Sequence, residues 1–372
     1  MFLDLRFTAL KNPTGVTKHI LNMVKGLSGY RNIDIEILAA YDQLDANRKI
    51  PPDNALHDFR AKSLPLAWHL SNILWAVSGL PLIENFCSGY DWIYCPKNDF
   101  IPSNKTRVAY TIHALREIDH ILPESFLVQE VLRRQRALLV YKRIVRRGNI
   151  IFSVSEFLKE QIVDLLNVNP ERIVVLGNGV EQVYFEADKM PLGISGEPAE
   201  RPYILVVGEL SYDDGGDRVV EIAGLLKKQM PNLRIIVAGC LYDARIKEKA
   251  DRLDNIEIRG YIPSEQLVFL MRDARALLYL PRHETFGIAA AEAMAVGLPV
   301  ITTRSTAIPE TVGDAGIYIN ENDNNEIMEV IKKVVYEGGF YKKYSIEGKK
   351  RAAMYGWDVC VRKLYNALVS YK

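Results

Sequence analysis

Short apolar runs alternate with helical patterns along almost the whole chain, and this alternation limits the folds that the chain can adopt. The runs in the first half are FLDLRF, IDIEILAA, DWIYC, RVAYTIH and IIFSVS. A helix is expected at 14–27, after the first run, and a longer one after the fourth. Strands that are buried on both faces of a parallel sheet form near-continuous apolar runs, and helices in the connections cover those faces. The sequence therefore predicts an α/β fold with doubly wound parallel sheets.

The alternation pauses once, at DKMPLGISGEPAE (188–200), whose proline, glycine and acidic residues are typical of a linker. It then restarts with PYILVVGEL, LRIIVAG, IEIRGYI, ALLYL, PVITT and GIYI. A chain of 372 residues is long enough for two domains. We expect a first domain at 1–185, a linker at 186–200 and a second domain at 201–354. The last apolar helix, within 355–372, is expected to pack back on the first domain.

Composition narrows the function classes. The chain is 48% hydrophobic and 25% charged with a net charge of +1, which gives no indication of a nucleic-acid partner. Its four cysteines lack metal or redox spacing, so we predict free thiols in a reducing compartment and no metal site. The N-terminus lacks the pattern of a secretory signal. The apolar stretch at 64–83 is interrupted by prolines and polar residues, which favours a helix on a core or an interface over a membrane span. These features predict a cytoplasmic protein.

The segment HETFGIAAAEAMAVGLPVI (283–301) carries two glutamates among small and apolar residues. Its strong helix formers predict a helix that Gly297 and Pro299 end. Glu284 would lie in the loop before this helix, at the carboxyl end of a strand, where helix N-termini offer N–H groups to anionic ligands. Glu292 would lie within the helix, and sugar or ribose hydroxyls could donate to it. The alternative is that Glu292 faces solvent and Glu284 only stabilises the helix end.

Taken together, these segments resemble the retaining glycosyltransferases of family 4. HETFGIAAAEAMAVGLPVI is similar to that family's E-x7-E signature. Other family segments are similar, in the same order, to TGV (14–16), VSEFLKEQIVDLLNVNPERIVVLGNGV and AIPETVGDAGIYI. The resemblance covers most of the chain and implies the GT-B architecture, two Rossmann-like domains that face a central cleft. It also implies transfer of a sugar from a nucleoside diphosphate sugar, of UDP or GDP type and without a further cofactor, to a glycan or lipid-linked acceptor of a cell-surface polysaccharide.

The resemblance assigns roles to the two glutamates. It implies that Glu292 accepts from the ribose hydroxyls and that Glu284 lies beside the donor sugar. It further implies that backbone amides of Thr285, Phe286 and Gly287 hold sugar hydroxyls or phosphate, a task that suits a helix N-terminus.

Two residues of the first domain also match family positions. His113 ends RVAYTIH and matches the family's histidine beside the transferred sugar. The residues alone are equally compatible with a histidine that is satisfied by neighbouring backbone. Gly15 matches the glycine turn after the first strand, which can approach phosphates closely because it has no Cβ. Its alternative role is a helix-entry turn.

One departure from the family pattern concerns the diphosphate. The family has an arginine and a lysine where VVGELSYDDGGDRVV places Glu209 and Asp214. Two acids would repel a leaving group that two cations would stabilise. Three explanations compete: a metal ion bridges acids and phosphate, Arg218 or Arg282 substitutes for the missing cations, or the protein binds without turnover. We favour substitution by an arginine.

The helix VLRRQRALLVYKRIVRR (131–147) carries seven basic residues among apolar ones. Such a helix could rest on the anionic inner face of a membrane, where lipid-linked acceptors are found. The alternative is a solvated helix face beside the core.

Two other function classes compete with a transferase. The first is a non-catalytic protein of the same fold that binds a sugar nucleotide or a partner glycosyltransferase. The second, a nicotinamide-dependent dehydrogenase, is disfavoured because TGVTKH contains no G-x-G-x-x-G.

Overall fold

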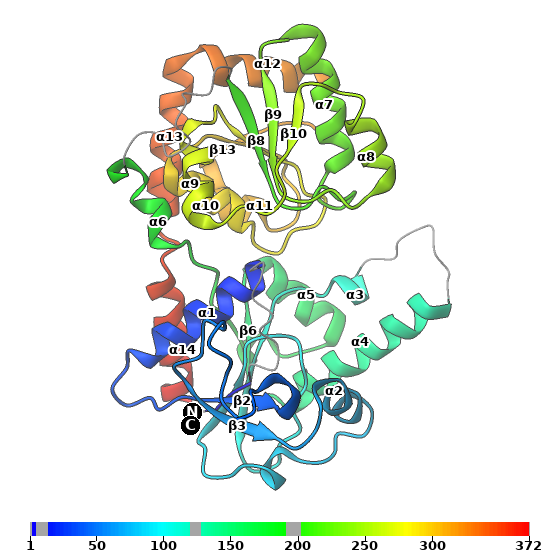
Figure 1. Ribbon diagram of the computed structural model, residues 1–372, viewed down its shortest axis with the longest axis vertical. Helices are drawn as coiled ribbons and strands as arrows, with labels where there is room; N and C mark the ends of the chain where they lie inside the picture. The colour runs from blue at the N-terminus through cyan, green and yellow to red at the C-terminus, as the bar shows by residue number, and fades with distance from the viewer. Residues whose placement is uncertain (1, 5–13, 120–127, 191–201, 372) are drawn as a thin grey trace. The chain divides into compact units, whose positions relative to one another are not determined.

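The computed structural model describes residues 2–4, 14–119, 128–190 and 202–371 (Figure 1). The chain forms two compact units, Met1–Gly177 with Trp357–Lys372 and Asn178–Gly356. The division falls earlier than expected, because 178–185 belongs to the second unit, where α6 (Gln182–Phe185) packs on α9 and α10. Linker residues 191–200 lie outside the described residues.

The first unit contains a parallel sheet in the order β3-β2-β1-β4-β5-β6-β7. All residues of β4 and β6 are buried, so helices or loops cover both faces of the sheet. Its strands are β1 (Phe2–Asp4), β2 (Glu36–Ala40), β3 (Arg60–Leu64), β4 (Trp92–Cys95), β5 (Arg107–Ile112), β6 (Ile150–Ser153) and β7 (Ile173–Val175). Its helices are α1 (Gly15–Ser28), α2 (Trp68–Val77), α3 (Arg116–Asp119), α4 (Val128–Arg147), α5 (Glu156–Leu166) and α14 (Trp357–Ser370).

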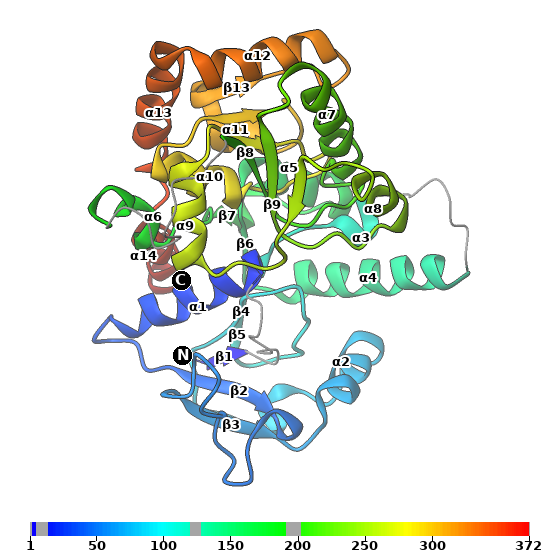
Figure 2. The same ribbon diagram turned by 45° about the horizontal axis from the view of Figure 1, so that its top comes forward.

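The C-terminal helix packs on the first unit, as predicted. Helices α1 and α14 lie side by side and share one hydrophobic core, in which Met23 and Leu27 meet Val361 and Leu364 (Figures 1 and 2). The rings of Tyr30 and Tyr365 stack with centroids 3.9 Å apart at the edge of this core. The last helix is therefore part of the core of the first unit, although almost the whole sequence separates it from α1.

The second unit contains a parallel sheet in the order β10-β9-β8-β11-β12-β13. Its strands are β8 (Tyr203–Val207), β9 (Arg234–Ala238), β10 (Ile256–Ile258), β11 (Leu277–Tyr279), β12 (Val300–Thr302) and β13 (Gly316–Tyr318). Its other helices are α7 (Gly216–Gln229), α8 (Ala244–Ala250), α9 (Ser264–Asp273), α10 (Ile288–Val296), α11 (Ile308–Val312), α12 (Asn324–Tyr336) and α13 (Gly338–Ala352). One core cluster joins α7 and α12 to the strands. The predicted doubly wound α/β fold is thus confirmed in both units.

Helix α10 occupies the centre of the second unit. Every residue from Ala290 to Val296 is buried, and the helix contacts α6, α9, α11 and α13. Small side chains are needed because so many elements approach it at once.

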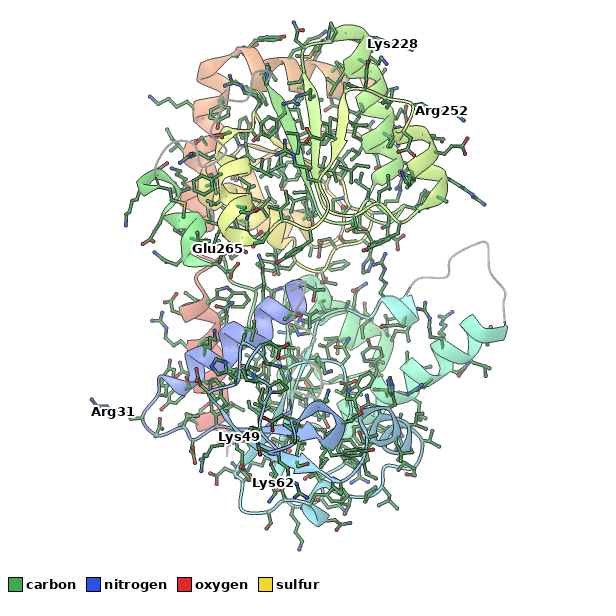
Figure 3. The ribbon with its side chains drawn as sticks, in the orientation of Figure 1. Arg31, Lys49, Lys62, Lys228, Arg252 and Glu265 are labelled. Atoms are coloured by element: carbon green, nitrogen blue, oxygen red, sulfur yellow. The ribbon has the colours of Figure 1, made fainter. Side chains whose placement is uncertain are left out.

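Basic side chains are spread over the outer surfaces of both units. Arg31, Lys49 and Lys62 lie on the first unit, and Lys228 and Arg252 lie on the second (Figure 3).

Candidate functional site

The helix predicted from HETFGIAAAEAMAVGLPVI forms as α10, with a glycine at each end. Gly287 precedes it with φ of 93° and Gly297 follows it with φ of 89°, a region that side chains disfavour. The loop from β11 to α10 therefore turns at Gly287 and brings 283–286 to the carboxyl end of the sheet. Glu284 lies in this loop, as expected.

The carboxylate of Glu284 is held at both oxygens. Oε1 accepts from the amides of Thr285 at 2.8 Å and Phe286 at 3.2 Å, and Oε2 accepts from the hydroxyl of Tyr279 at 2.5 Å. The two amides thus bond to Glu284 in this structure, and their contact with the donor stays a prediction. In this structure the side chain of Glu284 folds back on the amides of the two residues that follow it, in the loop before the N-cap Gly287. Gly287 supplies the turn between these amides and α10.

Glu292 is buried. The residue is 3% exposed, so the alternative in which it faces solvent is wrong. The negative charges of Glu284, Asp214 and Glu292 all act on the phenol of Tyr279. Burial and then these charges raise the pKa of Tyr279 well above its usual value. The structure thus gathers three predicted site residues around one tyrosine.

The two acids at the diphosphate positions differ in environment. Glu209 is exposed after β8, whereas Asp214 is half-buried and accepts a hydrogen bond from the hydroxyl of Ser211. The amide of Asp214 also donates to Ser211 Oγ at 3.2 Å. A side chain at Gly215 would come 2.1 Å from the carbonyl oxygen of Leu280, so the loops after β8 and β11 are in direct contact.

The two neighbouring arginines are paired with carboxylates of α7. Arg282 binds Asp217 through two hydrogen bonds of 2.7 and 2.9 Å, and its guanidinium lies 3.9 Å from the ring centre of Tyr212. Arg218 binds Glu221 at 2.5 Å. Each arginine is thus held beside α7 by a carboxylate, and its substitution for the missing cations stays a prediction. No group of three metal-binding side chains occurs among the residues that the structure describes.

In the first unit, His113 follows β5 and is buried. Its Nε2 lies 2.8 Å from the carbonyl oxygen of Pro96, which can only accept, so Nε2 carries the proton and Nδ1 keeps a lone pair. Burial lowers the pKa of His113 to about 4, although the bond to Pro96 opposes this shift. The ring is thus neutral at physiological pH, and backbone satisfies one of its two nitrogens. The place of His113 beside the transferred sugar stays a prediction.

Gly15 is the first residue of α1 and is exposed, next to the N-cap Thr14, whose hydroxyl accepts from the amide of Thr17 at 3.3 Å. One turn later His19 is fully buried, and its ring meets that of His113 edge to face with centroids 4.7 Å apart. The helix that begins at Gly15 therefore leads directly to His113. Sequence reasoning missed both His19 and Tyr279. His19 could have been found as a histidine one turn after Gly15, and Tyr279 as a polar residue at the carboxyl end of a strand.

A groove of about 400 Å³ lies beyond the carboxyl ends of β4 and β5, beside α2 and α4. Asn98 connects it to His113: Asn98 Oδ1 accepts from the amide of His113 at 3.2 Å, and its Nδ2 donates to the hydroxyl of Tyr141 at 3.0 Å. The groove is also lined by Trp68, Glu117, Arg133 and Arg136.

The basic helix predicted at 131–147 forms within α4 and exposes apolar as well as charged side chains. Val131 and Leu132 are 49% and 63% exposed. On the adjacent helix α2, a stripe of exposed apolar residues recurs at helical spacing, at Leu70, Ile73 and Val77. No helix in the described part of the chain is both long and apolar enough to cross a membrane.

Comparison with known proteins agrees with this geometry. Residues 13–182 match the model of Glycosyltransferase Family 4, and residues 192–351 match that of Glycosyl transferases group 1. The chain is therefore a glycosyltransferase with the GT-B fold, and the dehydrogenase alternative is excluded.

Two proteins are similar to the chain in sequence, and a solved structure is similar in fold. It is 25% identical over 289 residues to the O-antigen chain mannosyltransferase B of Escherichia coli, with 74% of each chain covered. It is 26% identical over 370 residues to an uncharacterized glycosyltransferase of Methanocaldococcus jannaschii, with 95% of each covered. The crystal structure of Anabaena HepE in complex with UDP and glucose is similar in fold, with a TM-score of 0.72, 14% identity and 99% of each chain covered.

Proposed function

We propose that the protein transfers a hexose from a UDP or GDP sugar, with retention of configuration, to a glycan or lipid-linked acceptor in the synthesis of a cell-surface polysaccharide. The observation that carries this proposal is the arrangement at α10, where Glu284 is fixed at the helix entry and Glu292 is buried beside it. Glu292 accepts from the ribose hydroxyls, and Glu284 lies beside the donor sugar. The proposal is supported by the complexes of a neighbour in fold with UDP and UDP-glucose and by the mannosyltransferase relatives.

The chemistry of this proposal depends on placement. A neutral His113 with a lone pair at Nδ1 can accept a hydrogen bond from a sugar hydroxyl, which a protonated ring could not do. Positioning of donor and acceptor, with stabilisation of the leaving diphosphate, supplies most of the rate. The acids at 209 and 214 oppose that stabilisation, which keeps a binding protein without turnover as the second candidate.

A panel of UDP, GDP, TDP and ADP sugars separates these candidates. Donors that bind raise the melting temperature, because ligand binding stabilises the native state. The donors selected in this way are then incubated with the protein, and release of the nucleoside diphosphate is measured with and without glycan acceptors. Release, together with a product of the donor's anomeric configuration, supports the proposal. Binding without release would favour the second candidate, and an inverted product would refute retention.

The acceptor side of the proposal rests on the first unit. The groove beside His113 combines an indole, two arginines and two carboxylates, Asp99 and Glu117, groups that suit the hydroxyls of a sugar. The stripe at Leu70, Ile73 and Val77, together with Val131 and Leu132, suits the lipid part of an acceptor or an anionic membrane surface. We therefore propose that the protein lies at the inner face of the membrane during transfer.

Vesicle sedimentation tests the membrane contact. Wild-type protein is mixed with vesicles of phosphatidylglycerol and phosphatidylcholine, and binding should fall as salt rises from about 0.05 to 0.5 M because screening shortens the reach of the basic residues. The double variant Leu70→Ser with Ile73→Ser should bind less. Tyr336→Ser, which removes a more exposed hydrophobic residue from the second unit, should bind as the wild type does. No binding at low salt would leave α4 as a solvated helix.

A further inference from the structure

Thr306 has a backbone conformation that its side chain disfavours. Its φ is 45°, and within the described ranges only Arg48 and Asn167 share a positive φ among residues other than glycine. Asn167 ends helix α5, a place where asparagine adopts this conformation readily. Threonine is branched at Cβ, so it pays a larger steric cost than either of the other two. A residue kept in such a conformation calls for a compensating interaction.

The compensating interaction is with Glu284. The hydroxyl Oγ1 of Thr306 accepts a hydrogen bond from the amide of Glu284 at 2.9 Å. The next residue, Ala307, donates its amide to the carbonyl oxygen of Glu284 at 3.2 Å. Residues 306 and 307 therefore bind both polar backbone groups of the glutamate.

Two further hydrogen bonds join the segment after β12 to residues on either side of Glu284. The hydroxyl of Ser305 donates to the carbonyl oxygen of Pro281 at 2.6 Å, and the hydroxyl of Thr311 donates to that of Phe286. The segment after β12 thus holds the loop before α10 at three successive places. Only the contact at Thr306 requires a strained backbone.

Glycine would adopt this conformation without strain, but it has no hydroxyl. We propose that Thr306 is a positioning residue, whose hydroxyl fixes the backbone of Glu284 so that the carboxylate is in place before the donor sugar binds. This inference rests on the proposed contact between Glu284 and the donor. A loosely held loop would leave the carboxylate displaced, and small displacements of a positioned group lower turnover strongly.

Three variants separate the hydroxyl from the backbone strain. Thr306→Gly removes both, Thr306→Ser keeps the hydroxyl, and Arg48→Gly relieves the steric cost of a positive φ in an exposed turn of the first unit. With UDP-glucose or GDP-mannose, whichever the wild type turns over, we expect Thr306→Gly to lower kcat by about tenfold or more with little change in KM. Thr306→Ser and Arg48→Gly should retain the wild-type kcat. Loss of kcat in Thr306→Ser equal to that in Thr306→Gly would overturn the role of the hydroxyl.

A double-mutant cycle tests whether Thr306 acts through Glu284. In a Glu284→Gln background, Thr306→Gly should cause little further loss, because the group that it positions no longer carries its charge. Equal losses in both backgrounds would overturn the inference.

Hydrogen exchange tests the same inference without turnover. The amides of Thr285 and Phe286 donate to the carboxylate of Glu284, so they should exchange faster in Thr306→Gly and at the wild-type rate in Thr306→Ser. Unchanged exchange in Thr306→Gly would refute the positioning role. A wild type that turns over no donor would instead refute the proposed function, and the exchange result would still decide the role of Thr306.

Discussion

The hydroxyl of Tyr279 donates to Oε2 of Glu284 at 2.5 Å. Tyr279 is the last residue of β11, and Glu284 lies five positions later, so the bond closes the loop between strand and helix on itself. Because burial and the nearby carboxylates raise the pKa of Tyr279, its phenol stays protonated and acts as a donor. The tyrosine therefore fixes one carboxylate oxygen, while the loop amides of Thr285 and Phe286 fix the other.

We predict that Tyr279→Phe lowers kcat by about tenfold to a hundredfold, since a hydrogen bond to a charged group is worth about 1.5–3 kcal/mol. Nucleotide affinity should change much less, because the phenol supports the residue beside the sugar. Steady-state kinetics and calorimetry with UDP or GDP measure the two effects. Tyr336→Phe is the control, because that tyrosine is 73% exposed. A kcat equal to the wild type would show that the amides alone place Glu284.

Glu292 gives a second prediction, which its burial makes more specific. Glu292→Gln keeps the volume of the side chain but removes the charge, and it should weaken binding of the preferred nucleotide by about tenfold or more. Glu292→Ala should in addition lower the melting temperature, because it leaves a cavity in the most buried helix of the second unit. Glu265→Gln, on the surface of α9 (Figure 3), should change neither. Unchanged affinity in Glu292→Gln would remove Glu292 from the ribose site.

These sites show where sequence reasoning succeeds. Helix α10 was predicted from its helix formers and its end from Gly297 and Pro299, signals that lie within a few residues of one another. The strand β3, by contrast, was not predicted, because RAKSL has exposed polar residues and lies at the edge of its sheet. A strand with one solvated edge lacks the continuous apolar run that marks the buried strands.

Contacts between segments that are distant in the sequence could not be predicted from the sequence pattern. Arg282 and Asp217 lie 65 residues apart, and no periodicity relates them. Nor could the pattern show that Glu284 folds onto the amides beside it, since that depends on the left-handed turn at Gly287 and on Thr306. The candidate residues could therefore be named from the sequence, but not which hydrogen bonds were already occupied.

Glu209 provides the third prediction. Because its side chain is exposed, Glu209→Arg should leave the fold intact. If position 209 faces the diphosphate, the change should tighten UDP or GDP binding by about threefold to tenfold, as charges 4 Å apart interact by about 1 kcal/mol in water. Adding Asp214→Lys should tighten it less than additively, because this change also removes the hydrogen bond with Ser211. Calorimetry measures these affinities, with Glu265→Arg as the control. Weaker nucleotide binding in Glu209→Arg would show that the acid at position 209 does not oppose the diphosphate.

The pairing of Arg282 with Asp217 gives the fourth prediction. Asp217→Asn removes the charge that holds the guanidinium, so Arg282 becomes available to a phosphate. If the arginine can replace the missing cation, nucleoside diphosphate affinity should rise in Asp217→Asn and fall in Arg282→Ala. Parallel losses in both variants would mean that the pair supports the loop and that the arginine does not bind phosphate.

The last prediction concerns pH and His113. Its pKa in the folded protein is about 4, below the value of about 6.5 for an unfolded chain, so the unfolded state binds more protons between these values. The stability that a neutral His113 provides is therefore complete above about pH 6.5 and is lost as the pH falls toward 4, by at most about 3 kcal/mol.

All four tryptophans, at 68, 75, 92 and 357, belong to the first unit, so tryptophan fluorescence during urea unfolding reports on that unit alone. We compare the wild type with His113→Asn between pH 7 and pH 4. The free energy of unfolding of the wild type should fall more steeply with acid than that of the variant, because an asparagine takes up no proton. His57→Asn, at an exposed position, should keep the wild-type slope. Equal slopes in the wild type and His113→Asn would show that His113 is not held neutral by burial, and its use as a hydrogen-bond acceptor for the sugar would then fail as well.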